Sequence, residues 1–132
     1  MNIGQVAKQS GLPAKTIRYY ESIGLVRRAA RRRSGYRDYD AADARRLRFI
    51  AQARALGFVV EEVRALLALY EDKSRASSDV KQLVLRHIGE IDRKIADLER
   101  LKAALGHLAE RCHGDDRPEC PILEGLGGAY GR

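Results

Sequence analysis

Leu12-Pro13-Ala14-Lys15-Thr16-Ile17-Arg18-Tyr19-Tyr20-Glu21 is the segment that best predicts the architecture of the N-terminal part of the chain. Pro13 suits the first turn of a helix, because the N–H that proline lacks has no intrahelical partner there. Gly24 predicts the end of this helix. A shorter helical pattern precedes it over residues 3–10 and stops at Gly11. Two short helices joined by a tight, glycine-containing turn predict a helix-turn-helix.

The next segment, residues 26–39, has the sequence Val-Arg-Arg-Ala-Ala-Arg-Arg-Arg-Ser-Gly-Tyr-Arg-Asp-Tyr. Two short arms flank its Ser-Gly pair, and its tyrosines favour extended structure, so we expect a β-hairpin wing. Helical patterns resume over residues 41–55 and 58–70. Residues 1–70 are therefore predicted to form a winged helix-turn-helix domain.

A long helix is predicted within the linker and dimerisation segment, residues 71–111. Its apolar residues follow one another at steps of three and four: Val84, Ile88, Ile91, Ile95, Leu98 and Leu105. This spacing is typical of a coiled-coil seam. A run of about 32 residues spans roughly 48 Å, which is longer than so small a domain can bury against itself. We therefore expect a mainly α-helical homodimer in which the same helix of a second copy covers the seam.

The net charge of +7 is unevenly distributed along the 132 residues. Residues 1–57 carry 13 Lys and Arg against 4 Asp and Glu, whereas residues 58–132 carry 12 against 14. A basic half joined to a nearly neutral half indicates a nucleic-acid contact surface. The alternative is a basic face that is simply solvated.

The exposed residues at the start of the second helix are the candidates for contacts with double-stranded DNA, because a helix fits the major groove. They are Lys15, Thr16, Arg18 and Tyr19. The wing adds Arg31, Tyr36 and Arg37, a basic cluster suited to the phosphate backbone. Tyr20 has a second interpretation as a core residue, since adjacent helical residues cannot both face one surface.

The two cysteines, Cys112 and Cys120, lie in a C-terminal segment, residues 112–132, predicted as a loop, one helical turn and a flexible tail. The N-terminus does not resemble a secretory signal and no apolar stretch reaches about 18 residues, so we expect a cytoplasmic protein without a membrane partner. Thiols stay reduced in that compartment, which leaves free, metal-binding or redox-active cysteines. Thiolates favour Cu(I), Ag(I), Au(I) or Zn(II), but a structural zinc site usually needs four ligands. The neighbouring His113 could be a third ligand.

Several motifs resemble the MerR family of transcription regulators: Ile3-Gly4-Gln5-Val6-Ala7, Thr16-Ile17-Arg18-Tyr19-Tyr20-Glu21, Gly24-Leu25-Val26, Gly35-Tyr36-Arg37-Asp38-Tyr39 and Leu56-Gly57-Phe58. The resemblance covers residues 1 to about 126. Within the family, the segment from Cys112 to Ile122 resembles the metal loop of copper-efflux regulators. That implies Cu(I) held between Cys112 and Cys120, with Ag(I) and Au(I) as mimics. Ser77 stands where members that sense divalent ions usually have a cysteine.

The resemblance also implies a mechanism. The dimer would bind a promoter whose two polymerase-recognition elements are badly spaced, and the metal-bound form would bend and untwist the DNA so that RNA polymerase engages both. A thiol-based redox sensor that uses Cys112 and Cys120 as a reversible disulfide is the alternative. An iron–sulfur cluster is disfavoured, because it typically takes four cysteines. We expect no enzyme, since the sequence offers neither a nucleophile–base set nor a phosphate-binding loop.

Overall fold

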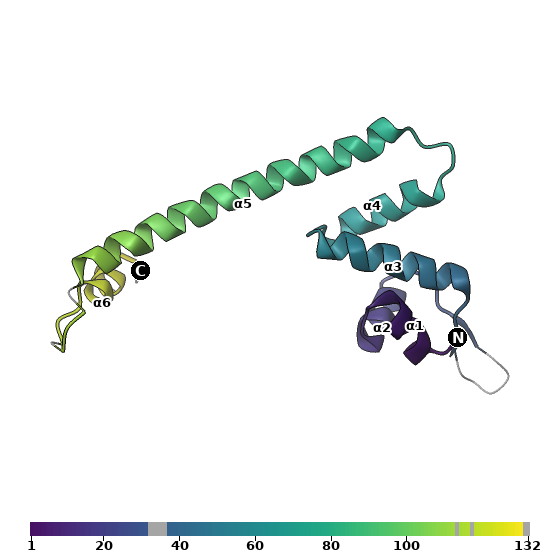
Figure 1. Ribbon diagram of the computed structural model, residues 1–132, viewed down its shortest axis with the longest axis horizontal. Helices are drawn as coiled ribbons and strands as arrows, with labels where there is room; N and C mark the ends of the chain where they lie inside the picture. The colour runs from purple at the N-terminus through teal and green to yellow at the C-terminus, as the bar shows by residue number, and fades with distance from the viewer. Residues whose placement is uncertain (32–36, 113, 117, 131–132) are drawn as a thin grey trace. The chain divides into compact units, whose positions relative to one another are not determined.

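The computed structural model describes residues 1–31, 37–112, 114–116 and 118–130 (Figure 1). The chain divides into two compact units, Met1–Leu83 and Val84–Arg132, and each is described by itself. Both are built mainly from α-helices, which confirms the predicted fold class. Within the described residues, no helix combines the length and the apolar character that a membrane span requires.

The N-terminal unit begins with the predicted helix-turn-helix, formed by α1 (Ile3–Ser10) and α2 (Ala14–Ser22). Asn2 and Gln5 form a reciprocal capping box, with both backbone-to-side-chain distances at 2.8 Å, and this box starts α1. Gly11 ends α1 with φ of +77°, a left-handed conformation that glycine adopts without strain. Pro13 is the N-cap of α2, one residue before the predicted first turn.

The wing, two further helices and the first residues of the long helix, as far as Leu83, complete this unit. Strand β1 (Ala30–Arg31) pairs antiparallel with β2 (Arg37–Asp38), with Ala30 opposite Asp38 and Arg31 opposite Arg37. The predicted turn at Ser34-Gly35 lies outside the described residues. Helices α3 (Ala41–Ala55) and α4 (Val60–Glu71) follow, and Asp40 caps the first of them through its hydrogen bond from the Asp43 N–H.

Two clusters of buried side chains hold these elements together. The first joins α1, α2, the base of the wing and α3: Val6, Ile17, Ala29, Tyr39, Ala44 and Leu47. The second joins α2, α3 and α4 and includes Tyr20, Ile50, Phe58 and Val63. Tyr20 is 5% exposed and its neighbour Tyr19 is 55% exposed. The core interpretation of Tyr20 is therefore confirmed, and Tyr19 remains on the surface.

Helix α5 (Ser77–Arg111) is a single helix of 35 residues. The six predicted seam residues lie in the C-terminal unit, and their exposed fractions run from 38% at Ile91 to 64% at Leu98. Within this monomer the seam is thus an open apolar face.

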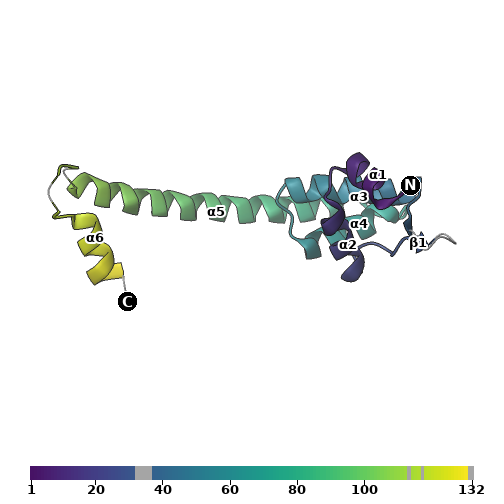
Figure 2. The ribbon, with the colours of Figure 1, turned by 90° about the horizontal axis from the view of Figure 1, so that it is seen from below.

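The chain turns back after α5 through a loop into α6 (Pro121–Gly125), which lies beside the end of α5 (Figure 2). A Cβ at Gly125 would lie 3.2 Å from Cδ2 of Leu108, so glycine permits this close approach. The predicted helical turn that begins at Pro121 is present as α6, and Leu126–Tyr130, which the sequence assigned to the tail, continue as a π-helical turn.

Candidate nucleic-acid interface and metal loop

Helix α2 presents four predicted DNA-contacting residues on its outer side. Lys15, Arg18 and Tyr19 are exposed, and Thr16 is half-buried. The opposite side of the helix carries Ile17, Tyr20 and Glu21, all of which are buried. The helix is therefore amphipathic in the sense that a DNA-contacting helix requires: one side anchors it and the other is available to a ligand.

A groove of about 380 Å³ lies beside this outer side of α2. Its lining residues come from α2, α3 and α4: Lys15, Thr16, Tyr19, Tyr20, Arg54 and Val60. Arg54 donates to the carbonyl of Phe58 at 2.9 Å, and this bond orients its guanidinium at the end of α3. The sequence did not single out Arg54, because its proximity to Lys15 depends on how α3 packs.

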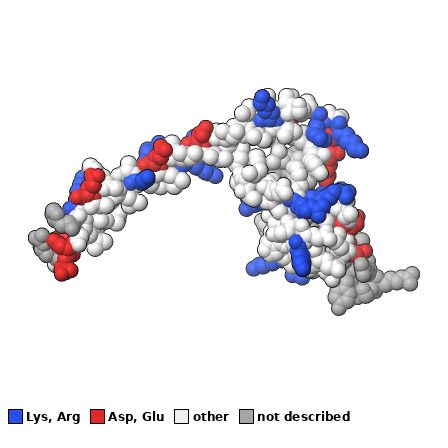
Figure 3. Space-filling view, in the orientation of Figure 1, with Lys and Arg blue, Asp and Glu red and all other residues white. Residues whose placement is uncertain are grey.

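The wing residues are described only in part. Arg31 and Arg37 lie opposite each other in the two strands, and Tyr36 lies outside the described residues. On the face that Figure 3 shows, lysine and arginine outnumber acidic side chains over the N-terminal unit, whereas both signs alternate along α5. This distribution agrees with the charge asymmetry of the sequence and suits a polyanionic ligand.

Cys112 and Cys120 occupy the two ends of the C-terminal loop. Cys112 directly follows α5, and its N–H donates to the carbonyl of Ala109 at 3.1 Å. Cys120 is the N-cap of α6. Both side chains are half-buried, and Cys112 lies close enough to Cys120 to lower the pKa of that thiol. The structure therefore brings together the two sulfurs that the sequence separates by seven residues.

The start of α6 lowers the pKa of Cys120 below the ordinary value of a thiol. The Leu123 N–H is the largest cause, and burial opposes it. The Ile122 N–H and the thiol of Cys112 lower the pKa further, whereas the charge of Glu124 raises it. Backbone N–H groups at a helix start stabilise the thiolate, which is the form that binds metals and reacts with oxidants.

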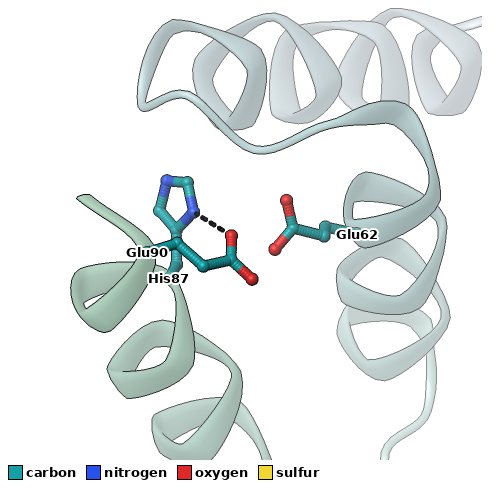
Figure 4. Close-up of side chains that lie close together, drawn as sticks. All are labelled: Glu62, His87 and Glu90. Atoms are coloured by element: carbon teal, nitrogen blue, oxygen red, sulfur yellow. Dashed lines mark ion pairs between the residues drawn. The ribbon is translucent and has the colours of Figure 1, made fainter. Parts of the chain in front are cut away.

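Ser77, His113 and His87 are the other predicted or possible metal-binding residues. Ser77 is the first residue of α5, and His113 lies outside the described residues. His87 lies within α5, with its Nδ1 3.8 Å from the Glu90 carboxylate one turn further along (Figure 4). His87 and Cys112 are thus separated by about 25 residues of helix, or roughly 37 Å at 1.5 Å per residue.

Comparison with known families and proteins identifies the group to which this chain belongs. Residues 1–69 match the model described as "MerR HTH family regulatory protein", and residues 44–108 match "MerR, DNA binding". The regulator HmrR of Rhizobium leguminosarum bv. viciae is 59% identical over 126 residues, which are 96% of this chain and 97% of the relative. The regulator CueR of Salmonella typhimurium is 44% identical over 128 residues, covering 97% and 93%.

A solved structure agrees with these matches. The transcription regulator PbrR691 from Ralstonia metallidurans CH34, determined in complex with lead(II), has a TM-score of 0.82 and 34% identity, covering 96% of this chain and 98% of that one. The matched proteins are transcription regulators, which confirms the expectation that this chain is no enzyme. Two family models, near-full-length relatives and a closely similar structure together show that the chain belongs to the MerR family of helix-turn-helix transcription regulators.

Proposed function

We propose that this protein is a homodimeric regulator that senses a soft monovalent metal ion, Cu(I) above all, and activates copper-efflux or detoxification genes. Ag(I) and Au(I) are the alternative ions. The observation that carries the proposal is the pair of half-buried thiols at the two ends of the loop between α5 and α6, where Cys112 lowers the pKa of Cys120.

The donor set favours a monovalent ion. The chain contains two cysteines in all, and a pair of sulfurs matches the coordination that Cu(I), Ag(I) or Au(I) accepts more readily than the four ligands of structural zinc. Ser77 supports this choice, because it supplies no thiolate to stabilise a divalent ion. One similar protein bears the name CueR and another was solved in complex with lead(II), so the experiments below measure which ion this chain binds.

The two cysteines would hold the ion between two helices. Closing Cys112 and Cys120 onto one ion would tie the end of α5 to the start of α6. The N–H groups of Ile122 and Leu123 would share in stabilising the sulfur charge of Cys120. A bound metal ion would supply positive charge that stabilises both sulfurs as thiolates.

The proposed DNA interface combines three elements of the N-terminal unit. The outer side of α2 would enter the major groove, with Lys15, Thr16, Arg18 and Tyr19 toward bases or phosphates. Arg31, Tyr36 and Arg37 of the wing would contact the flanking backbone. The third element is α3, whose Arg54 adds a positive charge beside Lys15 in the groove next to α2.

The open apolar face of α5 supports dimerisation. Six aliphatic residues at coiled-coil spacing are 38% to 64% exposed, and a second copy of the same helix is the partner that matches this pattern. With promoter DNA, the dimer would act on RNA polymerase indirectly, through the shape of the DNA. The proposed compartment is the cytoplasm, where promoter DNA and reduced thiols are both available.

The free energy that metal binding supplies can be compared with the cost of distorting the DNA. Bending a short duplex costs on the order of 1–6 kcal/mol. A metal ion that prefers the distorting state about 100-fold supplies about 2.7 kcal/mol, which is within that range.

Two measurements test the metal proposal. Reduced protein should bind one Cu(I) per subunit under anaerobic conditions against a competing chelator, with two short Cu–S contacts in X-ray absorption. Cys112→Ser should keep DNA affinity but lose metal-dependent transcription in a purified system. Ser74→Ala, which removes an exposed hydroxyl in the linker, is the control. Equal induction by the Cys112→Ser protein would refute metal sensing by this pair.

Redox sensing remains the second candidate, because the lowered pKa of Cys120 and its contact with Cys112 also favour disulfide formation. Activation of chelator-treated protein by peroxide, with loss of two free thiols per subunit, would support redox sensing. Activation by Cu(I) in the presence of a reductant would support metal sensing.

A further inference from the structure

A buried carboxylate lies on the inner side of the proposed DNA-contacting helix. Glu21 is in the last turn of α2 and is 5% exposed. Glutamate is rarely buried so completely, because a carboxylate that leaves water needs hydrogen-bond donors to replace it. The hydrogen-bond donors to Glu21 therefore indicate the role of this residue.

The two oxygens of Glu21 bind the two legs of the wing. Oε2 accepts the N–H of Ala29 at 3.1 Å, and Oε1 accepts the hydroxyl of Tyr39 at 2.8 Å. Ala29 directly precedes β1, and Tyr39 directly follows β2. Both residues are buried in the first core cluster. One side chain of α2 thus holds the base of the hairpin on both sides.

This attachment matters because the hairpin has little stability of its own. Each described strand is two residues long, and an isolated two-stranded hairpin is marginal in water. Its direction must therefore depend on how its base is fixed to the helices. Without the carboxylate, the Ala29 N–H and the Tyr39 hydroxyl would be buried without these acceptor atoms, which favours movement of the base.

We infer that Glu21 is a positioning residue for DNA binding: it sets the wing at a fixed place relative to α2, so that both elements contact one duplex together. The inference rests on the proposed DNA interface. Glu21 touches no DNA in this scheme, because it faces the core. Its effect on affinity would pass through Arg31 and Arg37, the two arginines in the paired strands.

A double-mutant cycle tests this route. The four proteins are the wild type, Glu21→Ala, the Arg31→Ala/Arg37→Ala protein and the protein with all three changes. The probe is a duplex that the wild-type protein selects from a random-sequence pool, with a mixed-sequence duplex of equal length beside it. Glu99→Ala, an exposed residue of α5, is the control for the same change of charge.

We expect Glu21→Ala to weaken binding to the selected duplex about tenfold. The salt slope, which is the decrease of log affinity with log salt concentration, should fall by up to about 1.8 per subunit, or about 0.9 for each lost phosphate contact. In the background that lacks both arginines, the same change should cost less than about twofold, because the residues through which it acts are gone. An equal loss in both backgrounds would overturn the inference and leave Glu21 a structural residue only.

Two further outcomes keep the test decisive. If removing both arginines leaves affinity and salt slope unchanged, the wing does not contact DNA, and the proposed interface fails whatever Glu21 does. If Glu21→Ala unfolds, Tyr39→Phe takes its place, because it keeps the packed ring and removes one of the two hydrogen bonds. Tyr39→Phe should then lower the salt slope with the thermal midpoint still above the assay temperature, and an unchanged slope would count against the inference.

Discussion

Ile95→Ala should weaken the proposed dimer without weakening the helix that carries it. Ile95 lies in the open apolar face of α5 and is 48% exposed. Alanine has a higher helix propensity than isoleucine, so the substitution does not disfavour α5 itself. The change therefore isolates the burial that a partner helix would provide.

The magnitude follows from the exposed fraction. Full burial of an isoleucine side chain contributes about 1.5–3 kcal/mol, and about half of that surface is still exposed in the monomer. A partner would recover about 0.7–1.5 kcal/mol for each subunit. A symmetric dimer contains the residue twice, so the loss is about 1.5–3 kcal/mol, or about a 10- to 150-fold rise in the dissociation constant.

Fluorescence-detected sedimentation at nanomolar concentrations can measure this constant for the metal-free protein. Arg93→Ala is the matched control, because Arg93 is exposed and lies about 200° around the helix from both Ile91 and Ile95. We expect the control to dissociate like the wild type. A dissociation constant within twofold of the wild type for Ile95→Ala would refute the assignment of this face to the dimer, as would a wild-type protein that stays monomeric.

Three other outcomes are expected. The Leu123 N–H lowers the pKa of Cys120, so the thiolate stabilises the folded state above the ordinary thiol pKa, and this stabilisation is lost as the pH falls through the pKa of the folded state. In metal-free Cys112→Ser protein, the midpoint of iodoacetamide alkylation against pH should therefore lie below the midpoint for the same protein in urea. Equal midpoints would contradict this expectation. Leu47→Ala should lower the free energy of unfolding by about 2–5 kcal/mol in a urea titration, because Leu47 is 1% exposed, and a loss below about 1 kcal/mol would mean that the core closes around the gap. Arg54→Ala should lower the salt slope of DNA binding by about 0.9 per subunit while Arg54→Lys keeps it, and equal slopes for all three proteins would remove Arg54 from the interface.

Local features of the sequence were sufficient for most of the helices. The apolar spacing in residues 3–10, the positions of Gly11 and Gly24, and the three- and four-residue steps after Val84 predicted elements that the structure contains. These signals act within a turn or two of helix, so they are available without knowledge of the fold. The π-helical turn at Leu126–Tyr130 was not predicted, because Gly127 and Gly128 have low helix propensity.

The candidate site was predictable in its residue types and less so in its arrangement. Lys15, Arg18 and Tyr19 were expected on the surface of α2, and they are exposed there. Arg54 was missed, because it lies 39 positions after Lys15 and only the packing of α3 against the other helices places both in one groove.

Residue types and short-range periodicity were enough to predict most of the helices, the basic half of the chain and the two residues that can supply sulfur, because these properties do not depend on how the chain folds. The nearness of Cys112 to Cys120 and the hydrogen bonds that Glu21 accepts from Ala29 and Tyr39 became visible in the folded chain alone. Such contacts join residues that are 8 to 18 positions apart. Their formation depends on the path of the whole chain between them, because the burial of many other side chains offsets the entropy lost in closing those loops.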